Sequence, residues 1–243
     1  MAVPWRTGMP DRPALDLGPM VRAGRPRKRW RWVGVFAEDV LLCVGSARIG
    51  PVPVSWWAVW DRRAGVFAER TVRRPLDTPA GEVAGTPVET ISSHDGNPIW
   101  TRKTPARFSG TARVGGRSYV LDSAPGLIDE SAGYHARHTT WRWTAGVGTT
   151  SDGRAVAFNH CAGMHDAPEA SERTVWVDGE PHHVGPDAVD RLAFTAEATR
   201  VHREDLWLVA TDYEQPFGSF SGELPVAGAI TGLGVIERQS VRW

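Results

Sequence analysis

Two tryptophans in one short segment, Trp141 and Trp143, are the residues best suited to form a small-molecule site. Side chains two positions apart on a β-strand leave the sheet on the same face, so we expect both indoles to point the same way. Flat aromatic surfaces suit an apolar ligand and attract a developing positive charge. The alternative is that both rings pack in a core, for which tryptophan is equally suited.

Several carboxylates could supply acid chemistry beside those rings. A carboxylic acid in an apolar site can protonate a carbon–carbon double bond, because desolvation raises its pKa. Asp122 follows the apolar run 119–121, Glu172 precedes a strand-like segment, and Asp129 and Glu130 are further candidates. We expect Asp122 or Glu172 to be the acid. The alternatives are a turn aspartate at Asp122 and a surface ion pair at Glu172.

Polar residues near the tryptophans could orient a ligand. Asn159 lies in the middle of a strand-like run, so its amide must be hydrogen-bonded if it points inward. It would contact a ligand or hold the hairpin to its neighbour. We predict His160 as a general base or orienting group, and Trp32 and His138 as further ligand contacts.

Histidines, an aspartate and a cysteine gather between residues 135 and 166, which raises the question of a metal site. Their spacing matches none of the standard zinc signatures, and adjacent residues on a strand face opposite sides. We therefore expect no metal and no cofactor.

Short strands joined by tight turns run along the whole chain. Three dipeptides, Gly115-Gly116, Asp152-Gly153 and Asp178-Gly179, supply the positive φ angles that two-residue hairpin turns require. Later strands are expected over 191–195, 206–211 and 229–243. Apolar residues at helical spacing never persist for three turns without a Gly or Pro, so very little helix is expected. The pattern favours an all-β, antiparallel barrel or sandwich.

The chain has 243 residues, enough for one large β-domain or two small ones. We expect an irregular lead-in over 1–27, an N-terminal β-domain over 28–130 and a C-terminal β-domain over 131–243. The two cysteines, Cys43 and Cys161, lie in apolar runs and form no disulfide framework, which favours a cytoplasmic location. The longest uncharged apolar run, 40–44, is too short to span a membrane.

Charge restricts the choice of partners. Lys+Arg 28 balances Asp+Glu 28, so no global field favours nucleic acid. The basic run 22–29 would permit contact with nucleic acid or an anionic lipid. Because Arg29 and Arg31 alternate with Trp30 and Trp32, the solvent face of a strand is the favoured interpretation. We expect a hydrophobic small molecule as the partner and no nucleic acid. The sequence leaves the oligomeric state open.

Several of these segments together resemble the family called domain of unknown function 2804. The resembling segments are 28–32, 119–126, 140–146, 152–154, 158–159, 162–163, Glu172, 177–182 and 232–237 with Trp243. That family is more distantly similar to the lipocalin-like (calycin) carotenoid hydratases and tocopherol cyclase. The resemblance implies one or two lipocalin-like β-units around an apolar cavity.

Two functions therefore remain open, with a purely structural or interaction role as a third. In the first, the protein binds an isoprenoid, lipid or polyketide-like molecule in a tryptophan-lined apolar cavity. In the second, it is a cofactor-independent hydratase, cyclase or isomerase that protonates such a molecule with a carboxylic acid. A buried carboxylate facing the cavity would favour the enzyme.

Overall fold

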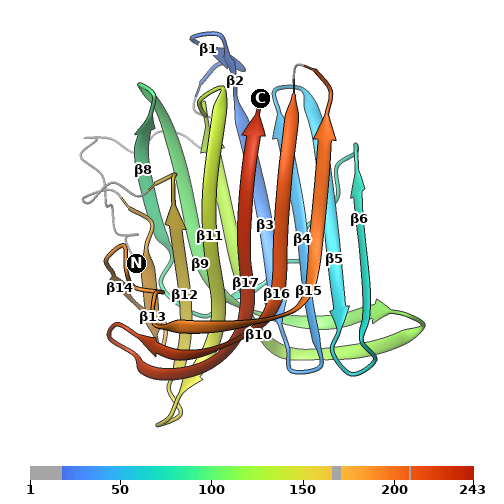
Figure 1. The fold of residues 1–243 in the computed structure, drawn as a ribbon, viewed down its shortest axis with the longest axis vertical. Helices are drawn as coiled ribbons and strands as arrows, with labels where there is room; N and C mark the ends of the chain where they lie inside the picture. Colours follow the sequence, from blue (N-terminus) through green and yellow to red (C-terminus); the bar gives the residue numbers. More distant parts are fainter. Residues whose placement is uncertain (1–17, 166–170, 208) are drawn as a thin grey trace.

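The fold is all-β and antiparallel, as predicted from the sequence. The computed structural model describes residues 18–165, 171–207 and 209–243, which contain strands and turns but no helix (Figure 1). Within these residues there is also no helix that could cross a membrane. The strands form two large sheets and one small two-stranded sheet, β1 (Val21–Arg22) with β2 (Arg25–Pro26).

The first large sheet takes its strands from the N-terminal half of the chain. Its order is β6-β5-β4-β3-β10-β9-β7, and β8 also pairs with β9. The strands are β3 (Lys28–Phe36), β4 (Val40–Ile49), β5 (Val52–Asp61), β6 (Val66–Val72), β7 (Glu82–Val83), β8 (Val88–His94), β9 (Asn97–Val114) and β10 (Arg117–Gly133).

The second large sheet takes its strands from the C-terminal half. Its order is β14-β13-β12-β11-β17-β16-β15. The strands are β11 (His138–Thr150), β12 (Ala155–Ala162), β13 (Thr174–Val177), β14 (Glu180–His183), β15 (Leu192–Asp205), β16 (Ala210–Leu224) and β17 (Gly228–Arg242).

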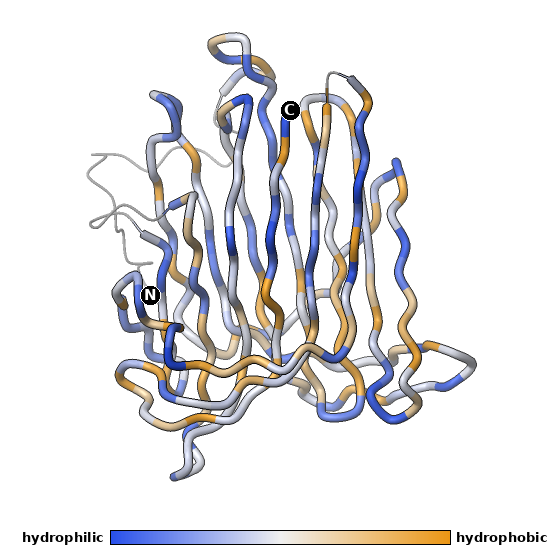
Figure 2. The backbone as a smooth tube through the Cα atoms, viewed as in Figure 1, coloured by the Kyte–Doolittle hydropathy of each residue, from blue (hydrophilic) through white to orange (hydrophobic). Residues whose placement is uncertain are grey.

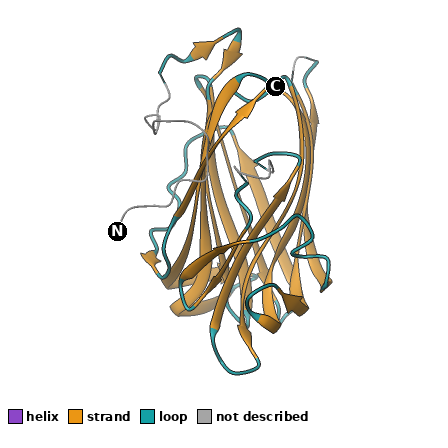
Figure 3. Cartoon of the chain, turned by 90° about the vertical axis from the view of Figure 1, so that its left-hand side faces the viewer, coloured by secondary structure: helices purple, strands orange, loops and turns teal. Residues whose placement is uncertain are grey.

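The two large sheets stack face to face as an open sandwich and do not close into a barrel (Figures 1 and 3). We call the end that holds β1, β2 and the C-terminus the upper end, and the opposite end the lower end. Alternate residues of each strand face the other sheet. The main core lies in this space and draws on both sheets, for example on Trp32 and Leu41 from one and on Trp143 and Phe217 from the other.

Each sheet also curls at the lower end and covers its own outer face. The long hairpin of β9 and β10 encloses a second core with β3 and β4, which includes Val33, Leu42 and Phe108. The lower parts of β15, β16 and β17 enclose a third core with β12 and β13, which includes Phe158 and Phe220. The lower halves of the strands are accordingly the more hydrophobic parts of the chain (Figure 2).

The three predicted hairpin turns are confirmed. Gly115 and Gly116 join β9 to β10 with φ values of 55° and 80°. Asp152-Gly153 joins β11 to β12, and Asp178-Gly179 joins β13 to β14. The strand expected over 206–211 is wrong in its first half: Leu206 N–H donates to the Val209 carbonyl at 2.8 Å, which closes a turn between β15 and β16.

Candidate functional site

The upper half of the space between the sheets contains a layer of buried polar side chains instead of an apolar core. Lys103 of β9 lies at its centre, only 5% exposed. Its Nζ lies 2.5 Å from Asp129 Oδ1 and 3.2 Å from Glu172 Oε1. Lys103 and Asp129 are direct partners across β9 and β10, so the sheet register alone brings them together.

Glu172 reaches this layer from the segment before β13. Asn159 of β12 donates from Nδ2 to the Glu172 carbonyl at 2.9 Å and to its Oε1 at 3.4 Å. Asn159 Oδ1 accepts a hydrogen bond from the indole of Trp143 at 2.6 Å. The second carboxylate oxygen of Glu172, Oε2, is buried without a hydrogen-bond partner among the described residues. One acceptor of this carboxylate is therefore left for a water or a ligand.

Glu237 of β17 is the third buried carboxylate. Its Oε1 accepts a hydrogen bond from the Trp141 indole at 2.7 Å, and its Oε2 accepts bonds from Tyr213 and Gln215, each at 2.8 Å. Among the described residues, no lysine, arginine or histidine forms an ion pair with it. Glu237 is thus a buried acid held by three neutral donors.

Lys103, Asp129, Glu172 and Glu237 form what we call the buried acid–base cluster. One ammonium and three fully ionised carboxylates would leave a net charge of 1 − 3 = −2 away from water, which is costly. Burial raises the pKa of Asp129, and the attraction of Lys103 offsets this only in part. Burial also raises the pKa of Glu237, against the hydrogen bonds from Tyr213 and Trp141. A carboxylic acid that keeps its proton here would relieve the excess negative charge.

The pKa of Lys103 moves the other way. Burial disfavours its charged form, but Asp129 and Glu172 outweigh this effect and raise its pKa above the usual value. Lys103 therefore stays an ammonium, and its charge lies 5.4 Å from the centre of the Trp143 ring. The cluster combines a fixed cation with two carboxyl groups that bind protons more tightly than usual.

The cluster lines a small cavity of about 30 Å³, with room for about one water molecule. Tryptophans close it: the rings of Trp30 and Trp141 are nearly parallel with centroids 6.4 Å apart, and Trp32 meets Trp143 edge to face at 4.9 Å. The expected space between tryptophans exists, but it is small and polar. The indole N–H groups of Trp141 and Trp143 bind Glu237 and Asn159, which holds the rings against the cluster.

A larger apolar groove of about 640 Å³ opens at the lower end, between the same two sheets. Its lining includes Phe36, Trp176, Val147, Leu233 and Pro105. Ligand pockets commonly have volumes of about 300–1,000 Å³. Leu233 and Glu237 lie on the same inward face of β17, four residues apart, which corresponds to about 13 Å along a strand. Ala145 and Val235 belong to the apolar core that separates the groove from the cluster.

Five of the eight predicted site residues lie in or beside the cluster. Trp141, Trp143 and Glu172 line the small cavity, Asn159 connects two of them, and Trp32 packs on Trp143. Trp143 and Asn159 face inward because Trp143 pairs with Cys161 and Ala145 pairs with Asn159 across β11 and β12.

The other three predicted residues lie elsewhere. Asp122 is exposed on β10, close to the hairpin that joins this strand to β9. His160 faces the outer side of β12, where its Nε2 lies 2.8 Å from the Pro186 carbonyl, and burial lowers its pKa. His138 is exposed on β11.

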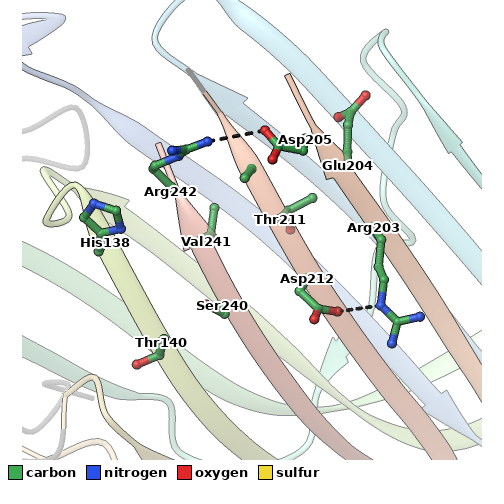
Figure 4. A pocket seen from close by; sticks show the side chains of 11 residues that line it. His138, Thr140, Arg203, Glu204, Asp205, Thr211, Asp212, Ser240, Val241 and Arg242 are labelled. Atoms are coloured by element: carbon green, nitrogen blue, oxygen red, sulfur yellow. Dashed lines mark hydrogen bonds and ion pairs between the residues drawn. The ribbon is translucent and has the colours of Figure 1, made fainter. Parts of the chain in front are cut away.

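His138 borders a hollow of about 530 Å³ on the outer face of the second sheet (Figure 4). Charged side chains dominate this hollow, and they are paired: Arg203 with Asp212 at 2.9 Å and Arg242 with Asp205 at 3.3 Å. Because the charges are satisfied and the walls are polar, this hollow does not fit an apolar ligand. In the part of the chain that the structure describes, no three histidine, cysteine, aspartate or glutamate side chains converge to hold a metal.

Sequence reasoning missed Lys103 and Glu237, although a signal for the lysine was present. Only two of the 28 basic residues are lysines, and both are buried. Lys28 of β3 donates to the His135 carbonyl at 3.2 Å and lies 4.8 Å from the ring of Trp243. In a chain that uses arginine almost everywhere, a lysine marks a position where a compact, enclosed cation is needed.

Residues 88–190 match the family model of the domain of unknown function DUF2804. This range includes Lys103, Asp129 and Glu172, whereas Glu237 lies beyond it. No curated protein matches the chain.

Three solved structures match most of the chain but share little sequence with it. A protein from Nitrosomonas europaea, provisionally described as AttH, is 12% identical over 98% of each chain, with a TM-score of 0.49. Kievitone hydratase from Nectria haematococca is 11% identical over 95% of this chain and 93% of its own, with a TM-score of 0.42. CghA is 10% identical over 89% and 88%, with a TM-score of 0.41. The resemblance to the DUF2804 family that the sequence predicts is thus confirmed, through residues 88–190.

Proposed function

We propose that the protein is a cofactor-independent enzyme that transfers protons to and from a hydrophobic small molecule at the buried acid–base cluster. The observation that carries this proposal is the excess of buried carboxyl groups over cations around the small cavity. Three carboxyls meet one ammonium there, and one carboxylate oxygen lacks a partner. Such an arrangement costs stability, which favours a role in chemistry over a role in packing.

Glu237 is the proton donor in this proposal. Its raised pKa keeps a larger share of the carboxyl protonated near neutral pH than for a free glutamate. Once Glu237 has given its proton to one carbon of a double bond, the hydrogen bonds from Trp141, Tyr213 and Gln215 stabilise the carboxylate. The faces of Trp141 and Trp143 attract the positive charge that develops on the neighbouring carbon.

Asp129 completes the reaction as the base. The Lys103 ammonium holds its carboxylate in place at 2.5 Å, and its raised pKa makes it a better proton acceptor than a free aspartate. Loss of a proton to Asp129 from the cation gives an isomerised or cyclised product. If Asp129 takes the proton from a water that attacks the cation, the product is hydrated. For the apolar body of the substrate to extend from the cluster into the lower groove, the core around Ala145 and Val235 must open.

Deuterium incorporation tests this proposal. Native mass spectrometry first identifies a hydrophobic molecule that copurifies with the protein. The molecule is then incubated with the protein in heavy water, and carbon-bound deuterium is measured. We expect incorporation with the native protein and a loss of at least about 100-fold with Glu237→Gln.

Glu214→Gln is the matched control, because Glu214 lies on the outer face of the same sheet, opposite Arg238 across β16 and β17. It should leave incorporation unchanged. If Glu237→Gln incorporates deuterium as fast as the native protein, Glu237 is not the donor. If the molecule binds but neither protein incorporates deuterium, the protein is a carrier of hydrophobic molecules. This second candidate function is favoured by the volume and lining of the lower groove.

A further inference from the structure

The turn between β15 and β16 presents two hydrophobic side chains to solvent at the upper end. Trp207 is 82% exposed and Leu206 is 50% exposed. Large apolar side chains in such a position are uncommon in turns, and an exposed tryptophan at a tip is typical of a contact surface. A second exposed pair, Met20 and Val21, lies beside the β1–β2 hairpin at the same end of the molecule (Figure 1).

The turn holds Trp207 outward through specific contacts. Asp205 Oδ1 accepts a hydrogen bond from the Trp207 backbone N–H at 3.0 Å, and Asp205 also pairs with Arg242 of β17. Trp207 has a φ of 63°, in the left-handed region that bulky residues rarely adopt. Backbone strain of this kind is maintained where the position of a side chain matters.

Positive charge surrounds the two exposed pairs. Six arginines lie in or next to the turns of the upper end: Arg22, Arg25, Arg27, Arg48, Arg137 and Arg242. The acidic residues described beside these turns are each paired with an arginine, Asp95 with Arg25, Glu204 with Arg73, and Asp205 with Arg242. The described part of the upper end therefore carries surplus positive charge, although the whole chain has a formal net charge of zero.

The lower end has the opposite character. Its turns carry the acidic residues Glu38, Asp39, Asp152, Asp178 and Glu223, of which Asp39, Asp152 and Glu223 are paired with Arg63, Arg154 and Arg191. Exposed apolar side chains occur there too, such as Val120 and Val226, but both of these are aliphatic. An anionic surface would therefore attract the upper end more strongly than the lower end.

We propose that the upper end docks on an anionic lipid surface, with Trp207 and Leu206 entering the interface at one side of this end and Met20 and Val21 at the other (Figures 1 and 3). Tryptophan is favoured at the boundary between lipid headgroups and acyl chains, because its ring is apolar and its N–H is polar. Basic residues next to inserted apolar side chains add attraction to anionic headgroups. The basic run at 22–29 thereby acquires a role that a solvated strand alone does not give it.

Sedimentation with sucrose-loaded vesicles tests the proposal on the full chain. One set of vesicles contains phosphatidylcholine only, and the other contains about one third phosphatidylglycerol. We expect the protein to bind the anionic vesicles, to bind less as the salt concentration rises, and to bind the neutral vesicles weakly. Leu206→Ser with Trp207→Ser should weaken binding about tenfold or more, and Arg22→Gln with Arg48→Gln should weaken it on anionic vesicles only.

Val120→Ser with Val226→Ser is the matched control, because it removes exposed apolar side chains from the lower end, 82% and 56% exposed. It should bind like the native protein, and circular dichroism checks that every variant is folded. No binding to anionic vesicles, or equal losses with the tip and control variants, would overturn the proposal. A self-association of the native protein that only the tip variant abolishes would also overturn it, and would identify the tip as a protein interface.

Discussion

Within the described residues, Lys103 is the cation that forms ion pairs with carboxylates of the buried acid–base cluster. Its ammonium lies within 3.2 Å of carboxylate oxygens from both halves of the chain, Asp129 on β10 and Glu172 in the segment before β13. Removing one partner of a buried ion pair leaves an uncompensated charge, which costs far more than the pair itself contributes. The charge of Lys103 thus makes the burial of the Asp129 and Glu172 carboxylates between the two sheets possible.

We expect Lys103→Met to lower the free energy of unfolding by about 3–5 kcal/mol, because Asp129 and Glu172 would then be buried without a cation. Urea unfolding at pH 7 measures the change. The double variant Lys103→Met with Asp129→Asn should recover part of the loss, since it removes one of the unpaired charges. A double variant that is less stable than Lys103→Met would show that the charges are not the cause.

Glu237 should give stability a distinctive pH dependence. Its pKa in the folded protein is raised above the usual 4.5. The folded state therefore binds this proton more tightly than the unfolded state, so the stabilisation is present at low pH and is lost as the pH rises through the interval between the two pKa values. We expect the free energy of unfolding to fall between about pH 4.5 and neutrality, and to fall less in Glu237→Gln.

Urea unfolding at a series of pH values measures both slopes. Asp129, whose pKa is also raised, is present in both proteins, so the difference between the slopes reports Glu237 together with its repulsion from Asp129. Equal slopes would show that folding does not raise the pKa of Glu237.

Single residues were predictable only where a local pattern placed them. The spacing of Trp141 and Trp143 predicted a shared face, and a mid-strand amide at Asn159 predicted a buried hydrogen bond. Glu237 carried no such signal, because an acid among β17 residues looks like any solvent-facing position. Its burial depends on Tyr213 and Gln215 of a neighbouring strand and on a sheet from the other half of the chain.

At the scale of elements, a row of glycines lets the second sheet bend. Gly146, Gly234 and Gly218 are direct neighbours across β11, β17 and β16. A Cβ at Gly234 would lie 2.2 Å from the Ala145 carbonyl oxygen, and one at Gly218 would lie 2.0 Å from the Thr195 carbonyl oxygen. The backbones approach each other too closely for any side chain, so only glycine permits this curvature.

We expect Gly234→Ala to reduce the free energy of unfolding by at least about 2 kcal/mol, because its methyl group must displace a backbone carbonyl. Gly185→Ala is the control: its Cβ would meet only the carboxylate end of Asp187, at 2.9 Å. That side chain can move, so the control should cost less than about 1 kcal/mol. Similar losses in the two variants would contradict a special role for the glycine row.

Elements were predictable where the turn chemistry was explicit. Gly115-Gly116, Asp152-Gly153 and Asp178-Gly179 identified three hairpins correctly. The segment 206–209 was misassigned as strand because its residues are apolar, whereas Leu206 and Trp207 lie in a turn and face solvent. Apolar composition predicts burial only where a partner surface covers it, and here none of the described elements does.

At the scale of the whole molecule, side chains that cross between the sheets fasten the two halves of the chain. A bulge in β15 between Ala196 and Ala198 turns Glu197 toward the first sheet. Glu197 accepts hydrogen bonds from the Trp60 indole at 3.0 Å and from Arg62 at 2.7 and 2.9 Å. Together with the shared core, this contact makes each half depend on the other.

We expect Glu197→Gln to lower the free energy of unfolding by about 1–3 kcal/mol, since it weakens three hydrogen bonds of a half-buried pair. The exposed pair of Arg63 with Asp39 provides the control, and Asp39→Asn should cost less than about 1 kcal/mol. Urea unfolding measures both. A loss at Glu197 no greater than at Asp39 would mean that packing alone joins the halves.

The all-β class followed from strand and turn patterns, but the stacking of the two sheets did not. The pairing of β3 with β10 joins residues about a hundred positions apart, and nothing local in the sequence specifies it. The core that the two sheets share could not be predicted either. The sequence shows that each contributing residue lies on one face of its own strand, but not which strand packs against that face. The division into β-domains at 28–130 and 131–243 stays a prediction.

The enclosure of both lysines has a practical consequence. Reagents that acylate amines find no lysine on the described surface of the folded chain, where Lys28 and Lys103 are 1% and 5% exposed. Acylation of Lys28 therefore requires the two sheets to separate near the edge, and acylation of Lys103 requires them to separate at the centre. Mass spectrometry can follow both labels over time. Labelling of Lys28 alone would report local opening at the edge, and labelling of Lys103 would report opening of the whole sandwich.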